Sequence, residues 1–146
     1  MKKNKQEQEL ELQFNIDQIE LNERQISKPP IRPLQKKDFG YEVGLEVKVN
    51  GEEGKTVHTI TIFVKGNEDK VEYGSISVSC TFIIYNFPVI VDIKEDSFVI
   101  PEYVIELLNT VTIGTARGIF FSEFRGTFLE KALLPILDVK AFQKQN

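Results

Sequence analysis

Few side chains in this chain could do chemistry, and they stand apart from one another. His58 is the only histidine and Cys80 the only cysteine. A general base needs a partner within hydrogen-bond reach, and the alternating stretch around His58 offers no nucleophile, so we expect an ordinary exposed strand residue there. Cys80 lies in the apolar phase of its own stretch, which favours an inert core thiol. A lone cysteine also excludes an internal disulfide.

The carboxylates and glycines form no recognisable metal or phosphate site. Asp92, Glu95 and Asp96 cluster without the glycine-bearing spacing of a calcium loop. Gly114 and Gly118 do not follow a strand, as the glycines of a phosphate-binding loop do. We therefore predict no catalytic residue, no metal, no cofactor and no enzymatic activity. An enzymatic or small-molecule-binding domain is the least favoured hypothesis, because it needs polar groups that converge on a pocket.

Length and composition narrow the function classes further. The chain has 146 residues, a net charge of -4, 41% apolar and 27% charged residues. Its mild acidity gives no electrostatic footprint for nucleic acid, and no uncharged apolar run approaches the ~18 residues of a membrane span. The polar start lacks the apolar stretch of a signal peptide. We expect a cytoplasmic protein with a disordered tail over residues 1–9, a single domain over residues 10–146, and no membrane insertion.

Alternation of apolar and polar residues predicts four strands, over residues 10–21, 41–49, 56–65 and 72–85. The apolar phase slips between Ile16 and Ile19, which predicts a bulge near Asp17 and Gln18. Asn50-Gly51 is a hairpin signal. The pattern indicates antiparallel strands with one dry face and one wet face.

The connection over residues 22–40 contains three prolines and no regular period, so it reads as a long extended segment. Connections of this length inside a compact domain tend to be functional. Its apolar residues Ile26, Ile31, Leu34 and Phe39 have no evident place of burial within the segment itself.

A helix is predicted from Pro101-Glu102 to a stop near Gly126. The β-branched residues at 110–113 weaken helix propensity, which predicts a kink or a split. Residues 129–134 could form a short second helix that Pro135 interrupts.

Two features of the helical segment call for a partner. Gly114, Gly118, Ser122 and Gly126 recur every fourth residue, and close approach of another element would offset the ~0.5–1 kcal/mol that an interior glycine costs. The alternative is that the helix breaks at these glycines.

The second feature is a cluster of four phenylalanines within nine residues, Phe120, Phe121, Phe124 and Phe128. One helical stripe cannot easily take them all, so part of this surface is buried in an oligomer or offered to a ligand. Plain core packing is the alternative.

The order of elements and several motifs resemble the SecB family of cytosolic export chaperones. Residues 14–19 resemble the family's opening strand, and residues 39–43 resemble the end of its crossover loop. Residues 115–119 and 124–128, followed by Leu134-Pro135, are similar to its main helix, which begins with aromatic-Ala-Arg-Glu, ends at Arg-Gly-(Gly/Thr)-Phe and leads to a Leu-x-Pro stretch. Thr115 stands where the family usually has Tyr, and Gly118 where it usually has Glu.

Residues 111–114 also replace the family's Pro-Asn-(Ile/Leu)-Leu-Phe-Pro segment. These departures indicate a divergent SecB-like branch and put docking to the SecA translocase motor in doubt. The resemblance implies an α+β fold, a four-stranded antiparallel Greek-key sheet with C-terminal helices packed on one face, assembled as a homodimer or homotetramer.

The resemblance further implies an ATP-independent holdase that binds unfolded or nascent polypeptides in apolar grooves, for protein export. The alternative keeps the fold but makes the protein a module dedicated to one protein partner, without general chaperone or translocase-targeting activity. The expected client contacts are Ile31, Leu34, Phe39, Phe128, Leu129, Leu133 and Ile136. The expected oligomer interface comprises Gly114, Gly118, Phe121 and Ser122.

Overall fold

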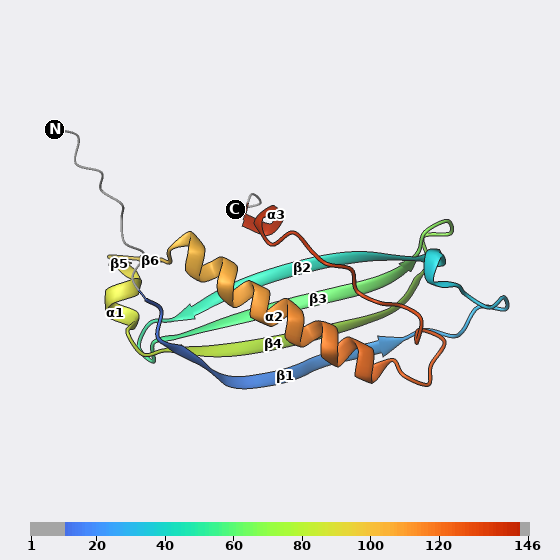
Figure 1. Cartoon of the computed structure of the whole chain (residues 1–146), viewed down its shortest axis with the longest axis horizontal. Helices are drawn as coiled ribbons and strands as arrows, with labels where there is room; N and C mark the ends of the chain where they lie inside the picture. Colours follow the sequence, from blue (N-terminus) through green and yellow to red (C-terminus); the bar gives the residue numbers. More distant parts are fainter. Residues whose placement is uncertain (1–10, 144–146) are drawn as a thin grey trace.

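A computed structural model of the chain describes residues 11–143, apart from the side chain of Gln143. The tail predicted over residues 1–9 lies outside the described residues. Figure 1 shows a long curved sheet crossed by one long helix. The elements in chain order are β1 (Phe14–Ile26), η1 (Lys36–Asp38), β2 (Phe39–Asn50), β3 (Lys55–Gly66), β4 (Glu72–Ile84), α1 (Phe87–Ile90), β5 (Asp92–Lys94), β6 (Ser97–Val99), α2 (Glu102–Glu123) and α3 (Lys140–Gln143).

The four long strands form one antiparallel sheet in the order β1-β4-β3-β2. The chain passes from β1 at one edge to β2 at the other, which is the Greek-key arrangement, and the predicted fold class is confirmed. The connection between these strands covers only residues 27–38. It is shorter than the predicted 22–40, because β1 runs on to Ile26 and β2 already begins at Phe39.

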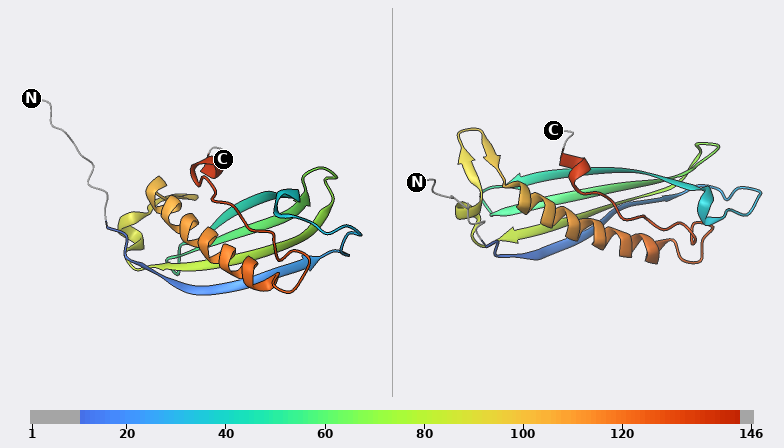
Figure 2. Two further views of the ribbon diagram at one scale, coloured as in Figure 1. Left: turned by 45° about the vertical axis from the view of Figure 1, so that its right-hand side comes forward. Right: turned by 45° about the horizontal axis from the view of Figure 1, so that its top comes forward.

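The sheet has one dry face and one wet face, as the alternation predicts. In β3 and β4 the even-numbered side chains are buried on the face that α2 crosses. They include Ile60, Ile62, Val64, Ile76, Val78 and Phe82. The opposite face carries hydroxyl groups that bond across the strands, with Thr59 Oγ1 and Ser79 Oγ 2.7 Å apart. All the elements that cover the sheet therefore lie on a single side (Figure 2).

Two irregularities in β1 keep its apolar side chains on the α2 side. The register shifts between Ile16 and Gln18, as predicted, and again between Leu21 and Glu23. After the second shift Arg24 also faces α2, and its Nε lies 3.2 Å from Glu123 Oε2. A guanidinium at the C-terminal end of a helix complements the helix dipole, so the bulged strand helps to fix the end of α2.

The predicted kink in α2 is wrong, because the helix is continuous from Glu102 to Glu123. The hydroxyls of Thr110, Thr112 and Thr115 donate to the carbonyl oxygens four residues earlier. This satisfies their polar groups inside the helix. Burial against the sheet overrides the weak local propensity. By length and composition alone α2 could cross a membrane, but its buried side packs on the sheet.

The helix predicted over residues 129–134 is not formed. Gly126 adopts φ +76°, which ends the helical path, and Thr127 Oγ1 both donates to the Phe124 carbonyl and accepts from the Leu129 N–H. Pro135 disfavours the helical conformation of the residue before it. Residues 124–139 instead form an irregular segment, the C-terminal strap, which returns over the sheet between α2 and β2 (Figures 1 and 2).

Candidate functional site

The C-terminal strap and the crossover loop, residues 27–38, meet over the same end of the sheet. Leu34 of the loop and Leu129 of the strap belong to one cluster of buried side chains, together with Phe39 at the start of β2. The Tyr73 ring packs edge-on against both Phe39 and Phe128, with ring centroids 6.5 and 6.0 Å away. A small cavity of about 210 Å³ separates the two segments. Loop and strap therefore share one apolar core.

The seven expected client-contact residues divide into two groups. Leu34, Phe39 and Leu129 are buried, and Phe128 is half-buried against the same cluster. Ile31, Leu133 and Ile136 are exposed, Leu133 by 44% and Ile136 by 94%. The structure thus brings loop and strap together. Leu34, Phe39, Phe128 and Leu129 form an apolar layer, which we call the floor, and Ile31, Leu133 and Ile136 lie exposed at the surface.

Polar contacts hold the strap as far as Pro135. Arg117 donates to the carbonyl oxygens of Leu134 and Pro135 over 3.2 and 3.0 Å. The Leu133 N–H donates to the Tyr41 hydroxyl over 2.8 Å, and burial raises the pKa of that hydroxyl. No hydrogen bond joins residues 136–142 to the sheet or to α2. Among the described residues, only apolar packing, through Leu137 and Val139, therefore holds residues 136–139 against the rest of the subunit.

The phenylalanine cluster splits as the crowded spacing predicts. Phe120 and Phe124 are fully buried, with ring centroids 4.8 Å apart. Phe128 is half-buried, whereas Phe121 is 51% exposed on the far side of α2. One helical face thus takes part of the cluster, and the Phe121 side chain stays exposed beside Arg125.

The four expected interface residues share the exposed side of α2. Gly114, Gly118, Phe121 and Ser122 all face away from the sheet. A Cβ atom added at Gly114 or Gly118 would meet nothing within 4 Å. The glycines therefore do not serve close packing inside the subunit, and the helix does not break at them.

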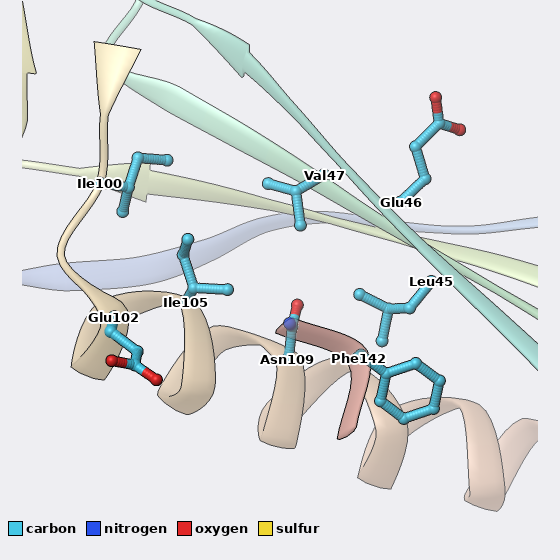
Figure 3. A pocket seen from close by; sticks show the side chains of 8 residues that line it. All are labelled: Leu45, Glu46, Val47, Ile100, Glu102, Ile105, Asn109 and Phe142. Atoms are coloured by element: carbon cyan, nitrogen blue, oxygen red, sulfur yellow. The ribbon is translucent and has the colours of Figure 1, made fainter. Parts of the chain in front are cut away.

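A larger cavity, which no sequence pattern indicates, lies between β2 and the first half of α2. It has a volume of about 540 Å³, and we call it the α2–β2 cavity. Leu45 and Val47 of β2 point into it, opposite Ile105 and Asn109 of α2, whereas Glu46 points away (Figure 3). Phe142 of α3 closes one side. The strap thus ends at the border of this cavity.

A buried polar network lies behind the α2–β2 cavity, and it corrects the expected exposure of His58, which is 0% exposed. His58 Nδ1 lies 2.7 Å from Asn109 Oδ1, and Nε2 lies 3.0 Å from Thr56 Oγ1. Since an amide oxygen only accepts, Nδ1 carries the proton and Nε2 accepts from the threonine hydroxyl. Burial lowers the pKa of His58, against a smaller opposing effect of Asn109. His58 shares its phase with Ile60 and Ile62, which is the signal that could have placed it inside.

Cys80 is fully buried, as predicted. Burial raises the pKa of its thiol, and hydrogen bonds with Thr112 and Thr115 oppose the shift only in part. Within residues 11–143, no group of three or more His, Cys, Asp or Glu side chains could hold a metal ion.

Comparison with known proteins gives a fold and no family. No family model matches the chain, and no curated protein matches its sequence. The Rv1957 SecB-like chaperone of Mycobacterium tuberculosis, solved with a ChAD peptide from the Rv1956 HigA1 antitoxin, aligns with a TM-score of 0.55 at 16% identity, over 86% of this chain and 90% of that one. This likeness establishes a SecB-like fold.

A protein of unknown function from Streptococcus agalactiae also aligns, with a TM-score of 0.41 and 11% identity, over 88% of this chain and 100% of that one.

Proposed function

We propose that this protein is an ATP-independent, SecB-like holdase that binds extended apolar segments of non-native polypeptides. The observation that carries the proposal is the exposure of Leu133 and Ile136 on the strap, above an apolar floor. A client segment that covers these side chains gains about 25 cal/mol for each Å² of apolar surface removed from water. No nucleotide is needed, since burial alone drives binding.

The client lies, in this proposal, along the strap and the crossover loop. Ile31, Leu133 and Ile136 make the first contacts because they are already exposed. Leu34, Phe39, Phe128 and Leu129 form the floor, which a client reaches when residues 133–139 of the strap move aside. Once one segment of a client is bound, its neighbouring segments are held at a high effective concentration near the remaining contacts. A long client therefore binds more tightly than any single segment.

Assembly into a homodimer or homotetramer is part of the same proposal. β1 is an edge strand of 13 residues, and an exposed edge of this length is a template for pairing with another chain. Its side chains Ile19 and Leu21 are exposed, as is the face of α2 that contains Gly118 and Phe121. A second copy would cover both. We place the assembled protein in the cytoplasm, with docking to the SecA motor as a separate question.

A second candidate is a module dedicated to one protein partner. Two observations favour it. Leu34 of the loop, Phe39 of β2 and Leu129 of the strap are buried in the free protein, which leaves a restricted apolar surface, and the Rv1957 chaperone was solved with a peptide from an antitoxin. In that case one stoichiometric partner would bind where a holdase takes many clients.

Suppression of aggregation tests the main proposal. The purified protein at a stoichiometric ratio, without ATP, should keep a chemically unfolded client from aggregating as followed by light scattering. The double variant Leu133→Ser, Ile136→Ser should lose this effect, while Val89→Ser, at an exposed apolar position of α1, should keep it. Absence of suppression by the unaltered protein refutes the holdase.

Affinity purification separates the two candidates. A heterogeneous set of nascent chains supports the holdase, and one partner in fixed stoichiometry supports the dedicated module.

A further inference from the structure

The two ends of the subunit carry opposite charge. At one end lie α1 and the β5–β6 hairpin, and at the other end lies the crossover loop (Figure 1). The hairpin, residues 92–99, has three carboxylates and one cation, whereas the loop, residues 27–38, has four cations and one carboxylate. Glu52, in the turn after β2, lies beside the hairpin. We call α1, the hairpin and this turn the acidic end.

Most of these charges are exposed and have no partner within the subunit. Among the described residues, no ion pair includes Glu52 or a hairpin carboxylate, and none includes the loop cations Lys28, Lys36 and Lys37. The 13 residues of β1 separate the two ends by about 40 Å. The two sets of charges therefore cannot meet within one subunit, and a contact between them joins two copies.

Exposed apolar side chains accompany both charged regions. At the acidic end Ile93 is 61% exposed and lies opposite Phe98 in the β5–β6 pair. The Phe98 ring packs on Phe87, and it lies so close to Gly51 that an added Cβ atom would be 2.2 Å from the ring. This packing fixes the hairpin to the sheet. In the loop, Ile31 is fully exposed. Apolar side chains with charged residues around them are the composition of a protein interface.

A two-fold arrangement of two copies brings the unlike ends together. The start of β1 belongs to the acidic end, where the Tyr85 N–H donates to the Gln13 carbonyl over 2.8 Å. The crossover loop follows directly after Ile26, the last residue of β1. An edge strand that pairs with its own copy about a two-fold axis runs antiparallel to it. The acidic end of each copy then lies beside the loop of the other, so the contact forms twice and the assembly closes.

We infer that the acidic end is a docking surface for the crossover loop of a second copy of this chain. The inference rests on the proposed assembly and names the contact that sets its direction. A parallel arrangement would bring like charges together, which is unfavourable, whereas the antiparallel one pairs unlike charges. Ile31, which the proposed function assigns to clients, is covered in this contact, so a second copy and a client compete for it.

Sedimentation velocity over a range of protein concentrations measures the dissociation constant of the assembly on the full chain. For the unaltered protein this constant should rise about tenfold or more between about 0.1 and 1 M NaCl, because the Debye length falls from about 10 to 3 Å. A constant that does not rise with salt overturns the inference.

Charge reversal tests whether the unlike ends meet. The hairpin variant Glu95→Lys, Asp96→Lys should weaken assembly by about tenfold or more, since both contacts become repulsive. The loop variant Lys36→Glu, Lys37→Glu should weaken it to the same extent. An equimolar mixture of the two variants should assemble as tightly as the unaltered protein, because each altered end then meets its complement. A mixture that stays dissociated overturns the inference.

A matched control separates this contact from an effect of net charge. Glu42→Lys, Glu46→Lys changes the net charge as much as the hairpin variant does, at exposed positions in the middle of β2. It should shift the constant less than about twofold, and weakening equal to that of the hairpin variant overturns the inference. If assembly is insensitive to salt and to the hairpin charges, only this docking fails. If the unaltered protein is a monomer at every concentration, the proposed assembly fails as well, and suppression of aggregation decides on the holdase separately.

Discussion

Lowering the pH below 6.5 should weaken the folded state through His58, whose ring is fully buried between Thr56 and Asn109. Burial lowers the pKa of His58 from its ordinary value of 6.5. Between that value and the lower folded pKa, only the unfolded chain takes up the proton. The stability contribution of the neutral ring is therefore complete above pH 6.5 and is lost as the pH falls. The free energy of unfolding should decrease by about 1.4 kcal/mol per pH unit in this window.

Urea unfolding at fixed protein concentration, followed by circular dichroism at several pH values between 7.5 and 5, measures this slope. His58→Gln provides the reference, because a glutamine does not titrate and His58 is the only histidine. The variant should lose about 1–3 kcal/mol at neutral pH, as it leaves Thr56 or Asn109 without a partner, but it should be flatter in pH. Equal slopes for the two proteins would refute the assignment of His58 as a buried neutral ring.

Three further predictions concern assembly, the core and the thiol. Gly118→Leu should lower the particle mass in light scattering, because the larger side chain would obstruct an interface at α2. The thermal stability of the subunit should not fall, since a Cβ there meets no atom within 4 Å and leucine favours the helix by up to ~1 kcal/mol. An unchanged mass contradicts an interface at α2. Phe120→Ala should reduce the free energy of unfolding by about 3–5 kcal/mol, since the ring is fully buried; a loss below ~1 kcal/mol in urea unfolding would contradict its place in the core. Cys80 should react with a thiol reagent only when the protein unfolds, since its thiol is fully buried and burial also raises its pKa; rapid labelling of the native protein would contradict this.

The sheet could be predicted from the sequence because alternation is a local signal. Four strands and the bulge after Ile16 follow from the positions of apolar residues alone, and the structure reproduces them. The conformation of the C-terminal strap could not be predicted in the same way. Whether residues 129–134 form a helix depends on Gly126, Thr127 and Pro135 acting together with the packing of Leu129 and Leu134 against the sheet.

The candidate site shows the same division. The sequence singled out the loop and the strap, and the structure brings them together. It could not reveal that Leu34 and Phe39 are covered, since their burial depends on contacts with a strap about 90 residues away in the chain. The polar side chain of His58 indicates exposure, whereas its phase with Ile60 indicates the interior, where the structure places it. Asn109 carried no signal, because a polar residue in a helix is ordinarily exposed.

Site-specific photo-crosslinking tests most directly whether client polypeptides lie on the strap side of the sheet. A photoreactive phenylalanine analogue at position 136, which is 94% exposed on the strap, should crosslink to an unfolded client in the absence of ATP. The same analogue at position 44, exposed on the opposite face of β2, should not. Equal crosslinking from the two positions, or crosslinking from position 44 alone, would contradict the account.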